Sequence, residues 1–444
     1  MDGNISYLFL PFSYRSRNQF STLVNYFDRS EEWDLVQDEI RYMFRFVAEK
    51  MDCRDRKNCR CFHFRFRSEY RDQNGLASAE EWYTMSEHSF NGIMTRFRFQ
   101  IMGLELFCFS TSICLLAFQL HFEKNEPFWV SNAQYYLKKV SRELIWQDGG
   151  PDIPVTILDL AKDIFRDCLN SFGFDFFFYA NQKTERANML TCLEVAPKED
   201  YTEELYFLRR CYHDGFQFVE DKKAEATEIF YTSSDIIWGV SPEAAICLTA
   251  PESSRRWEFF EKIFYHNFEN QYLYMYVLLL HRKYALYMFL TRIGVGMYND
   301  LKKLEDYRNV LYEFDTDFTF SRVTEVHQYQ MLYDRLEKVH ALKKLYEDVR
   351  EPVVSLGEVR RDSYEKKEKE RDELVNNALA LLAFLGIGSI LRDIYQFTGA
   401  FLGLLLDEHK VKLIQVFIVI IVAIICIRTV IRLIILNIDK KNRL

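Results

Sequence analysis

The segments ALALLAFLGIGSIL, residues 378–391, and VKLIQVFIVIIVAIICI, residues 411–427, decide how the whole chain is interpreted. They belong to the two runs that are apolar and long enough to cross a bilayer. The first run continues to Leu406, and the second continues with interruptions to Ile438. A membrane-spanning helix needs about 20 mainly apolar residues. The two runs therefore predict two transmembrane helices, and the second run meets the criterion better than the first.

A very short polar break, Asp407-Glu408-His409-Lys410, separates the two runs, so the helices would be antiparallel neighbours in a hairpin. Basic residues precede the first run and follow or flank the end of the second: Lys366, Lys367, Lys369, Arg371, Arg428, Arg432, Lys440, Lys441 and Arg443. Because cytoplasmic flanks of membrane spans are enriched in Lys and Arg, both termini are expected in the cytoplasm. The expected location is the cell inner membrane, as a multi-pass protein.

Composition limits the partners and the redox state that are expected. The chain has 444 residues, of which 49% are hydrophobic, enough for two or three cores. A net charge of −8 argues against nucleic acid as the main partner, since phosphate binding requires a basic surface. The ten cysteines of a cytoplasmic chain are expected to be reduced thiols.

The N-terminal part alternates between strand-like and helix-like patterns. Apolar or alternating segments predict strands at Ile5–Phe12, Phe62–Phe66, Thr95–Phe99, Gly103–Phe109, Ile113–Phe122, Phe174–Tyr179 and Met189–Val195. Helices are expected at Phe20–Phe27, Glu31–Lys50 and Asn132–Trp146. Ser110-Thr111-Ser112 is interpreted as the turn of a hairpin. This order predicts a mixed α/β or α+β domain over about the first 250 residues.

The second half is expected to be helical. Apolar residues recur at spacings of three and four in Phe259–Thr291 and again in Val323–Val349, which predicts two long helices. Pro352 should kink or restart the second helix. Between Arg360 and Glu373 nearly every residue is charged, as expected of a stalk helix that enters the first apolar run. The predicted organisation is a cytoplasmic α/β domain (1–254), a helical subdomain with the stalk (255–373), a two-helix transmembrane hairpin (374–438) and a basic cytoplasmic tail (439–444).

This layout resembles the CorA family of divalent-cation channels and transporters, in architecture over the whole chain and in sequence over about Glu370–Leu444. The resemblance implies a homo-oligomer, a pentamer in the family, whose first spans line a pore. An Asn near the cytoplasmic mouth of that pore corresponds to Asn376 or Asn377. The Gly-Met-Asn signature that closes the first span in the family is missing, and Ile394–Thr398 occupies its place. Gly296-Met297-Tyr298-Asn299 lies elsewhere in the chain and is interpreted as chance.

The missing signature makes the chain look more like the divergent CorA-like proteins that accompany type III CRISPR systems. That resemblance implies a ligand-gated antiviral defence effector, which permeabilises the inner membrane in response to a nucleotide messenger, S-adenosylmethionine joined to AMP (SAM-AMP). One alternative is a divalent-cation transporter for Mg²⁺. A second alternative is a non-conducting, membrane-tethered scaffold.

Five residues of the first run are candidates to line a pore: Asn376, Asn377, Ser389, Arg392 and Asp393. Carboxamides repeated around a pore can replace part of a cation's hydration shell, and charge inside a membrane is costly enough to suggest a function. The alternative for the two Asn residues is solvation where a helix enters lipid. The alternative for Arg392 and Asp393 is that the span ends at Leu391.

The segment from Cys53 to Arg67 holds two further groups of candidates. Cys53, Cys59, Cys61 and His63 have the residue types of a zinc site, although ligands usually pair two to four residues apart, and packed thiols are the alternative. A basic group could bind a phosphate-bearing ligand, and a solvated strand face is its alternative: Arg54, Arg56, Lys57, Arg60, Arg65 and Arg67.

Motifs of common enzyme classes are absent from the sequence. There is no Walker loop, His-Glu-x-x-His helix, Gly-x-Ser-x-Gly elbow or Rossmann glycine fingerprint. Ser110–Ser112 and Asp315-Thr316-Asp317 are interpreted as turns rather than active sites. The chain is therefore expected to be a channel or sensor and not an enzyme.

Overall fold

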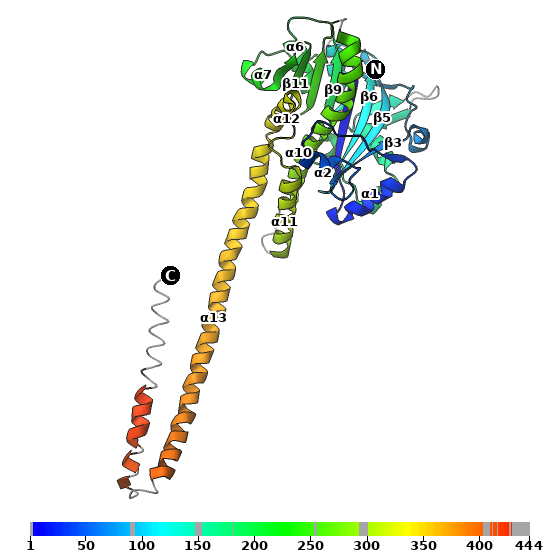
Figure 1. The fold of residues 1–444 in the computed structure, drawn as a ribbon. Helices are drawn as coiled ribbons and strands as arrows, with labels where there is room; N and C mark the ends of the chain where they lie inside the picture. Colours follow the sequence, from blue (N-terminus) through cyan, green and yellow to red (C-terminus); the bar gives the residue numbers. More distant parts are fainter. Residues whose placement is uncertain are drawn as a thin grey trace. The chain divides into compact units, whose positions relative to one another are not determined.

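The computed structural model describes residues 3–88, 94–146, 153–179, 181–252, 255–292, 301–402, 409–410, 412–414, 416–425 and 428 (Figure 1). The chain divides into two compact units, Met1–Val354 and Ser355–Leu444. Each unit is described by itself below.

A single large sheet forms the centre of the Met1–Val354 unit. In the described residues it has twelve strands, in the order β10-β11-β12-β9-β1-β6-β5-β4-β7-β8, with β3 also paired to β5 and β2 paired to β3. The pairing of β12 with β9 is parallel, and the other pairs among the described strands are antiparallel. The strands are β1 (Ile5–Ser13), β2 (Trp33–Leu35), β3 (Cys61–Phe66), β4 (Tyr83–His88), β5 (Met94–Phe109), β6 (Ile113–Phe122), β7 (Glu143–Trp146), β8 (Ile153–Thr156), β9 (Asn188–Glu194), β10 (Ile229–Ser233), β11 (Ile236–Val240) and β12 (Ala244–Thr249).

Both faces of the sheet are buried, as the central strand β1 demonstrates. Successive side chains of a strand point to opposite faces. Leu8 and Leu10 pack into one hydrophobic cluster, whereas Tyr7 and Phe9 pack into the other. A strand that is covered on both sides must be apolar at nearly every position, which is why Ile5–Phe12 has no polar face.

Helices cover both faces of this sheet. Helices α1, α3, α4 and α6 contribute to the first cluster, and α2, α10, α11 and α12 contribute to the second. The α-helices are α1 (Phe20–Arg29), α2 (Arg45–Met51), α3 (Pro127–Leu137), α4 (Ile157–Ile164), α5 (Leu169–Phe172), α6 (Thr202–Arg210), α7 (Lys222–Glu228), α9 (Tyr265–Asn267), α10 (Leu273–Arg292), α11 (Leu301–Phe318), α12 (His327–Val339) and α13 (Leu342–Leu402). Two π-helices, η5 (Arg256–Phe264) and η6 (Phe268–Tyr272), lead into α10, and η1 (Arg17–Gln19) is a 3-10 turn before α1.

The mixed α/β prediction for the N-terminal part is confirmed, as are the strands at Ile5–Phe12 and Phe62–Phe66 and the hairpin around Ser110–Ser112. The helix predicted over Asn132–Trp146 is wrong beyond Leu137, because Glu143–Trp146 forms β7 and pairs with β4 and β8. The strand predicted at Phe174–Tyr179 does not form, and one isolated bridge joins Asp175 to Ser13.

The long helix predicted over Val323–Val349 is divided in two. Helix α12 ends at Val339, and Ala341 has a φ of 50° before α13 begins at Leu342. A left-handed residue cannot continue a right-handed helix, so the break is fixed at Ala341. Pro352 lies inside α13 and neither ends nor restarts it.

The prediction of two transmembrane helices over 374–438 is wrong. Among the described residues, no helix combines the length and the apolar composition that crossing a membrane requires. The apolar segment Ala378–Leu391 has fourteen residues before the exposed Arg392-Asp393, fewer than the roughly 20 needed. The predicted inner-membrane location and the ion-channel interpretation rested on these two spans and are corrected with them.

Much of the predicted hairpin lies outside the described residues. This applies to Asp407, Glu408, Val411 and the segment 429–444, which includes the predicted basic tail. Lys410 and Lys412, at the start of the second run, are among the residues that the structure describes. Gly296–Asn299 also lies outside the described residues.

Candidate functional site

The structure separates the six basic candidates of the Cys53–Arg67 segment and pairs most of them with carboxylates. Arg54 binds Asp52 (Nε–Oδ1 2.9 Å), and Arg56 binds Asp28 (2.8 Å). The remaining pairs are Arg65 with Glu105 (3.1 Å), Arg67 with Asp34 (2.6 Å) and Arg60 with Asp317 (3.2 Å), while the Lys57 backbone N–H donates to Asp55. The six residues therefore form no common basic patch, and Arg60 alone among them lines one of the cavities described below.

The four predicted zinc ligands lie on different faces of the sheet. Cys53 and Cys59 pack into the first hydrophobic cluster, and Cys61 packs into the second. The His63 ring lies between Tyr274 Oη (Nδ1, 2.8 Å) and Glu105 (Nε2, 3.2 Å). No group of three or more His, Cys, Asp or Glu side chains in the described part of the chain is placed to hold a metal ion.

Glu105 is buried beneath this histidine. Burial raises the pKa of its carboxyl group, but the neighbouring His63 and Arg65 more than offset that effect and hold the pKa below its usual range. The carboxylate therefore stays ionised and binds both side chains. His63 is thus part of a polar contact between β3, β5 and α10.

The five pore candidates lie on α13, and their side chains are exposed in the single chain. The Ser389 hydroxyl donates to the Gly386 carbonyl oxygen (2.8 Å), a local helical contact. Asn376, Asn377, Arg392 and Asp393 share this helix, and among the described residues no side chain from another element forms a hydrogen bond or ion pair with them.

A cavity of about 600 Å³ lies at the tip of the β5–β6 hairpin, and we call it the hairpin-tip cavity. Its walls come from η1 and the start of α1, the residue before β3, the hairpin tip and α11. The lining residues are Arg17, Asn18, Phe20, Ser21, Arg60, Ser110, Thr111, Val310, Glu313, Phe314, Asp317 and Phe318. Its volume is within the usual range for small-molecule sites, about 300–1,000 Å³.

Charged groups of both signs line the hairpin-tip cavity, two arginines and two carboxylates. Arg17 binds Glu313 (2.6 Å) and Arg60 binds Asp317 (3.2 Å). Lys50 also binds Asp317 from outside the lining. The charges of the lining balance, and the Lys50 ammonium group is a third cation next to it. Arg17 and Glu313 are 296 residues apart in the chain, so the fold alone brings them together.

A buried histidine contacts Thr111, one of the residues that line the hairpin-tip cavity. The Thr111 hydroxyl lies 2.7 Å from Nε2 of His281 on α10, and the His281 ring stacks on Phe109 with centroids 3.8 Å apart. Burial lowers the pKa of His281 well below its usual value, and the adjacent Arg282 lowers it further, so the imidazole is neutral.

The hairpin tip itself is strained. Ser112 has a φ of 74°, in the left-handed region that residues with a side chain seldom adopt. Such conformations persist where the surrounding structure fixes them, and they gather at functional sites. The turn predicted at Ser110–Ser112 is confirmed, and two of its residues also line the cavity. Asp315–Asp317, predicted as a turn, lies in α11 instead.

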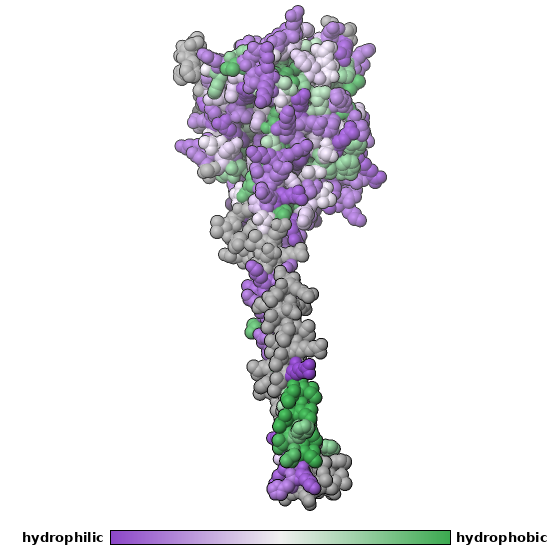
Figure 2. Space-filling model, turned by 90° about the vertical axis from the view of Figure 1, so that its left-hand side faces the viewer, coloured by the Kyte–Doolittle hydropathy of each residue, from purple (hydrophilic) through white to green (hydrophobic). Residues whose placement is uncertain are grey.

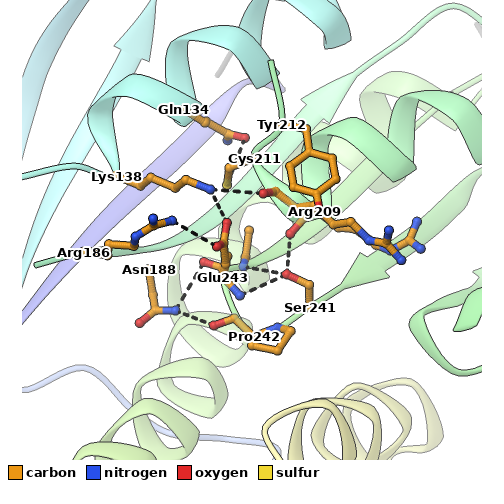
Figure 3. A network of polar contacts seen from close by, with 12 residues as sticks. Gln134, Lys138, Arg186, Asn188, Arg209, Cys211, Tyr212, Ser241, Pro242 and Glu243 are labelled. Atoms are coloured by element: carbon orange, nitrogen blue, oxygen red, sulfur yellow. Dashed lines mark hydrogen bonds and ion pairs between the residues drawn. The ribbon is translucent and has the colours of Figure 1, made fainter. Parts of the chain in front are cut away.

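A second polar cluster surrounds the β11–β12 turn (Figure 3). The Glu243 carboxylate binds Lys138 and Arg186, which point toward it from α3 and from the residues before β9. The Ser241 hydroxyl donates to the Arg209 carbonyl oxygen and accepts the N–H groups of Glu243 (3.0 Å) and Ala244 (3.2 Å).

Helix α10 joins this cluster through two side chains. Lys283 Nζ donates to the Pro242 carbonyl oxygen (3.2 Å), and Tyr284 Oη donates to Asn188 Oδ1 (2.6 Å). The Asn188 amide nitrogen donates in turn to the Pro242 oxygen (2.9 Å). Because these groups bind one another, we interpret the cluster as the contact that fixes α10 against the sheet, and α10 carries His281 to the hairpin-tip cavity.

The comparisons with known proteins give no match: no family model, no curated protein and no solved structure is similar to the chain. The resemblance to the CorA family stays a prediction. The residues of the site were only partly visible in the sequence. Arg60 was among the basic candidates, whereas Arg17 and Glu313 were missed because no local pattern connects residues so distant in the chain.

Proposed function

We propose that the Met1–Val354 unit is a sensor that binds a small anionic molecule of the nucleotide class in the hairpin-tip cavity. The observation that carries the proposal is the pair of arginines, Arg17 and Arg60, which line one cavity of about 600 Å³ with the Lys50 ammonium group next to it. Guanidinium groups bind phosphate oxygens through two parallel hydrogen bonds.

The rest of the lining suits the remainder of a nucleotide. Phe20, Phe314 and Phe318 offer apolar and aromatic surface, and Ser21, Ser110 and Thr111 offer hydroxyl groups. A phosphate would compete with Glu313 and Asp317 for the two arginines, and both carboxylates belong to α11. Binding would therefore loosen the ion pairs that tie α11 to the sheet side of the cavity, which gives the sensor two states.

A panel of ligands tests this proposal on the full chain by thermal unfolding: AMP, ATP, S-adenosylmethionine, SAM-AMP and Mg²⁺ alone. We expect a ligand that carries phosphate to raise the unfolding temperature in a concentration-dependent way, because it binds the folded state only. The shift should be lost in Arg17→Ala and kept in Arg56→Ala, a control at another ion-paired arginine, which binds Asp28 and does not line the cavity. Equal shifts in both variants, or no shift with any phosphate, would contradict the proposal.

We further propose that the chain forms a homo-oligomer through the Ser355–Leu444 unit. Large apolar side chains there are exposed in the single chain, including Leu374 (69%), Leu379 (57%) and Leu382 (63%) on α13. Figure 2 shows hydrophobic residues gathered on the surface of this unit, where Val416, Phe417, Ile420, Ile421, Ile424 and Ile425 are also exposed. Exposed apolar surface of this kind marks an interaction site.

A second copy of the chain is the partner that fits best. The stretch from Arg360 to Glu373 carries six basic and six acidic residues, so two copies can pair opposite charges along their helices. Light scattering after gel filtration should give an oligomeric mass for the wild type and a smaller mass for Leu379→Glu/Leu382→Glu. Val219→Glu, at an exposed apolar residue of the other unit, is the control. A wild type that is monomeric at every concentration would refute self-association.

A further inference from the structure

A second cavity, of about 270 Å³, is lined by residues from β10, the start of β11, η5, η6 and the start of α12, and we call it the aromatic cavity. Tyr42, Phe259, Tyr272 and Tyr329 contribute its aromatic lining. The Tyr329 ring lies 4.6 Å from the Tyr272 ring and 5.4 Å from the Tyr42 ring, measured between centroids. Three rings from three separate segments of the chain therefore meet at one wall.

Burial and backbone hydrogen bonds fix the positions of the three tyrosines. Tyr272 and Tyr329 are almost fully buried. The backbone of Tyr42 is fixed at both ends, since its N–H donates to Gln271 Oε1 and its carbonyl oxygen accepts the Thr324 hydroxyl. Burial raises the pKa of Tyr272 well above its usual value, so the phenol stays neutral. Rings that are fixed in this way offer a flat apolar surface before any ligand arrives.

An uncommon backbone conformation precedes α10 and contributes to the lining of the cavity. Arg256–Phe264 and Phe268–Tyr272 are π-helical, on either side of the single turn that contains Asn267. π-Helical turns are rare, and they occur frequently at functional sites because the extra residue changes the direction in which side chains project. Here the two π-helical segments contribute Phe259 and Tyr272 to the cavity, and the turn between them contributes Asn267.

The lining of the aromatic cavity includes polar groups. Asn267 and Gln328 line it with carboxamides, and neither side chain makes a hydrogen bond to another described residue. A carboxamide presents a donor and an acceptor side by side. Arg255 is the charged member of the lining, and it is neutralised by Asp235 (2.6 Å) while its guanidinium lies 5.1 Å from the centre of the Phe259 ring.

We infer that the aromatic cavity binds an uncharged, planar nitrogen heterocycle of the nucleobase class. Flat aromatic walls stack on such a ring, and carboxamides read the donors and acceptors along its edge. Arg255, paired with Asp235, is the one charged residue among the described residues of this lining, whereas four charged residues line the hairpin-tip cavity. A volume of about 270 Å³ admits one ring system with a small substituent and excludes a peptide.

The inference is independent of the proposed function. Tyr272 lines the aromatic cavity and His281 supports the hairpin-tip cavity, nine residues further along the same helical segment. At a rise of 1.5 Å per residue this separation is about 14 Å. A ligand in one cavity therefore leaves the other open, and the two can be tested separately.

Nucleosides, which carry no phosphate, are the appropriate probes. Saturation-transfer NMR and calorimetric titration of the full chain with adenosine, guanosine, cytidine and uridine should detect binding of at least one. Asn267→Ala and Gln328→Ala should each weaken that binding by about tenfold, because each leaves a polar edge of the ligand unpaired. Asn270→Ala is the matched control, since the Asn270 amide donates to the His266 carbonyl oxygen and does not line the cavity.

Arg60→Ala changes the other cavity and should leave nucleoside affinity unchanged. No binding of any nucleoside, or the same affinity in Asn267→Ala, Gln328→Ala and Asn270→Ala, would overturn the inference. Loss of nucleoside binding in Arg60→Ala with no loss in Asn267→Ala would also overturn it, by assigning the heterocycle to the hairpin-tip cavity. Asn267 and Gln328 are not in the buried core, so both variants are expected to fold.

Discussion

Replacing Lys283 by Met should stabilise the Met1–Val354 unit at neutral pH. Lys283 on α10 is buried against the β11–β12 turn, where its ammonium group donates to the Pro242 carbonyl oxygen. Burial lowers the pKa of Lys283 from 10.5 to about 8, although the nearby Glu243 carboxylate acts in the opposite direction. The charged form is therefore less stable in the folded protein than in the unfolded chain.

The size of the effect follows from this difference in pKa. A shift of 2.5 pKa units corresponds to about 3 kcal/mol, since each unit is worth about 1.4 kcal/mol. Between pH 8 and pH 10.5 the unfolded chain binds a proton at Lys283 that the folded protein does not, so folding stability rises with pH in this window. Below pH 8 the full cost is present. Met removes this cost and loses one hydrogen bond of about 1 kcal/mol, which leaves a net gain of about 2 kcal/mol at pH 7.

Urea unfolding, followed by the fluorescence of the buried Trp238 on β11, measures this difference. The advantage of Lys283→Met over the wild type should be greatest at pH 7 and should disappear as the pH approaches 10.5. Lys343→Met, at a lysine whose side chain is 84% exposed, is the control and should change stability little at either pH. A destabilised Lys283→Met at pH 7, or a difference that does not depend on pH, would refute the reasoning.

Two further predictions concern the same unit. Ser241→Ala should lower the free energy of unfolding, measured in urea, by about 2 kcal/mol, because the hydroxyl binds the Arg209 carbonyl oxygen and two backbone N–H groups in a buried turn. A variant as stable as the wild type would contradict a structural role for the cluster. Ala341→Gly should raise stability by about 0.5–1 kcal/mol, because Gly adopts the φ of 50° without the steric cost that Ala has there. Ala226→Gly, within α7, should have the opposite sign. A loss of stability in Ala341→Gly would show that the left-handed residue is not strained.

The sheet could be predicted where its pattern is local. The strands β1, β3 and β6 are continuous or alternating apolar segments, and the hairpin between β5 and β6 has its turn at Ser110–Ser112. Strand β7 could not be predicted, because Glu143–Trp146 continues a helical pattern and becomes a strand only by pairing with β4 and β8. Tertiary pairing overrides local preference in such short segments.

The transmembrane prediction failed for a different reason. It counted apolar residues across Arg392 and Asp393, which interrupt the first run and are exposed on α13. We propose that the same exposed apolar residues form contacts between copies of the chain. The break at Ala341 could not be predicted either. Apolar residues keep the spacing of one helix throughout residues 323–349, but the left-handed conformation of Ala341 separates α12 from α13.

Few of the residues that line the two cavities could be predicted from the sequence. Arg60 was a candidate because it lies in a basic segment, but its partner Asp317 lies 257 residues away on α11. The aromatic cavity combines Tyr42, Asn267 and Tyr329 from three distant segments. None of these combinations has a spacing that a motif could describe, so both sites emerge only when the chain is folded.

Calorimetric titration of the full chain with the best phosphate-bearing ligand of the panel tests the central claim most directly. We predict measurable binding to the wild type and to Arg56→Ala, and a loss of affinity of about tenfold or more in Arg60→Ala, since a hydrogen bond to a charged group is worth about 1.5–3 kcal/mol. Identical affinities in Arg60→Ala and Arg56→Ala would show that the hairpin-tip cavity is not the ligand site.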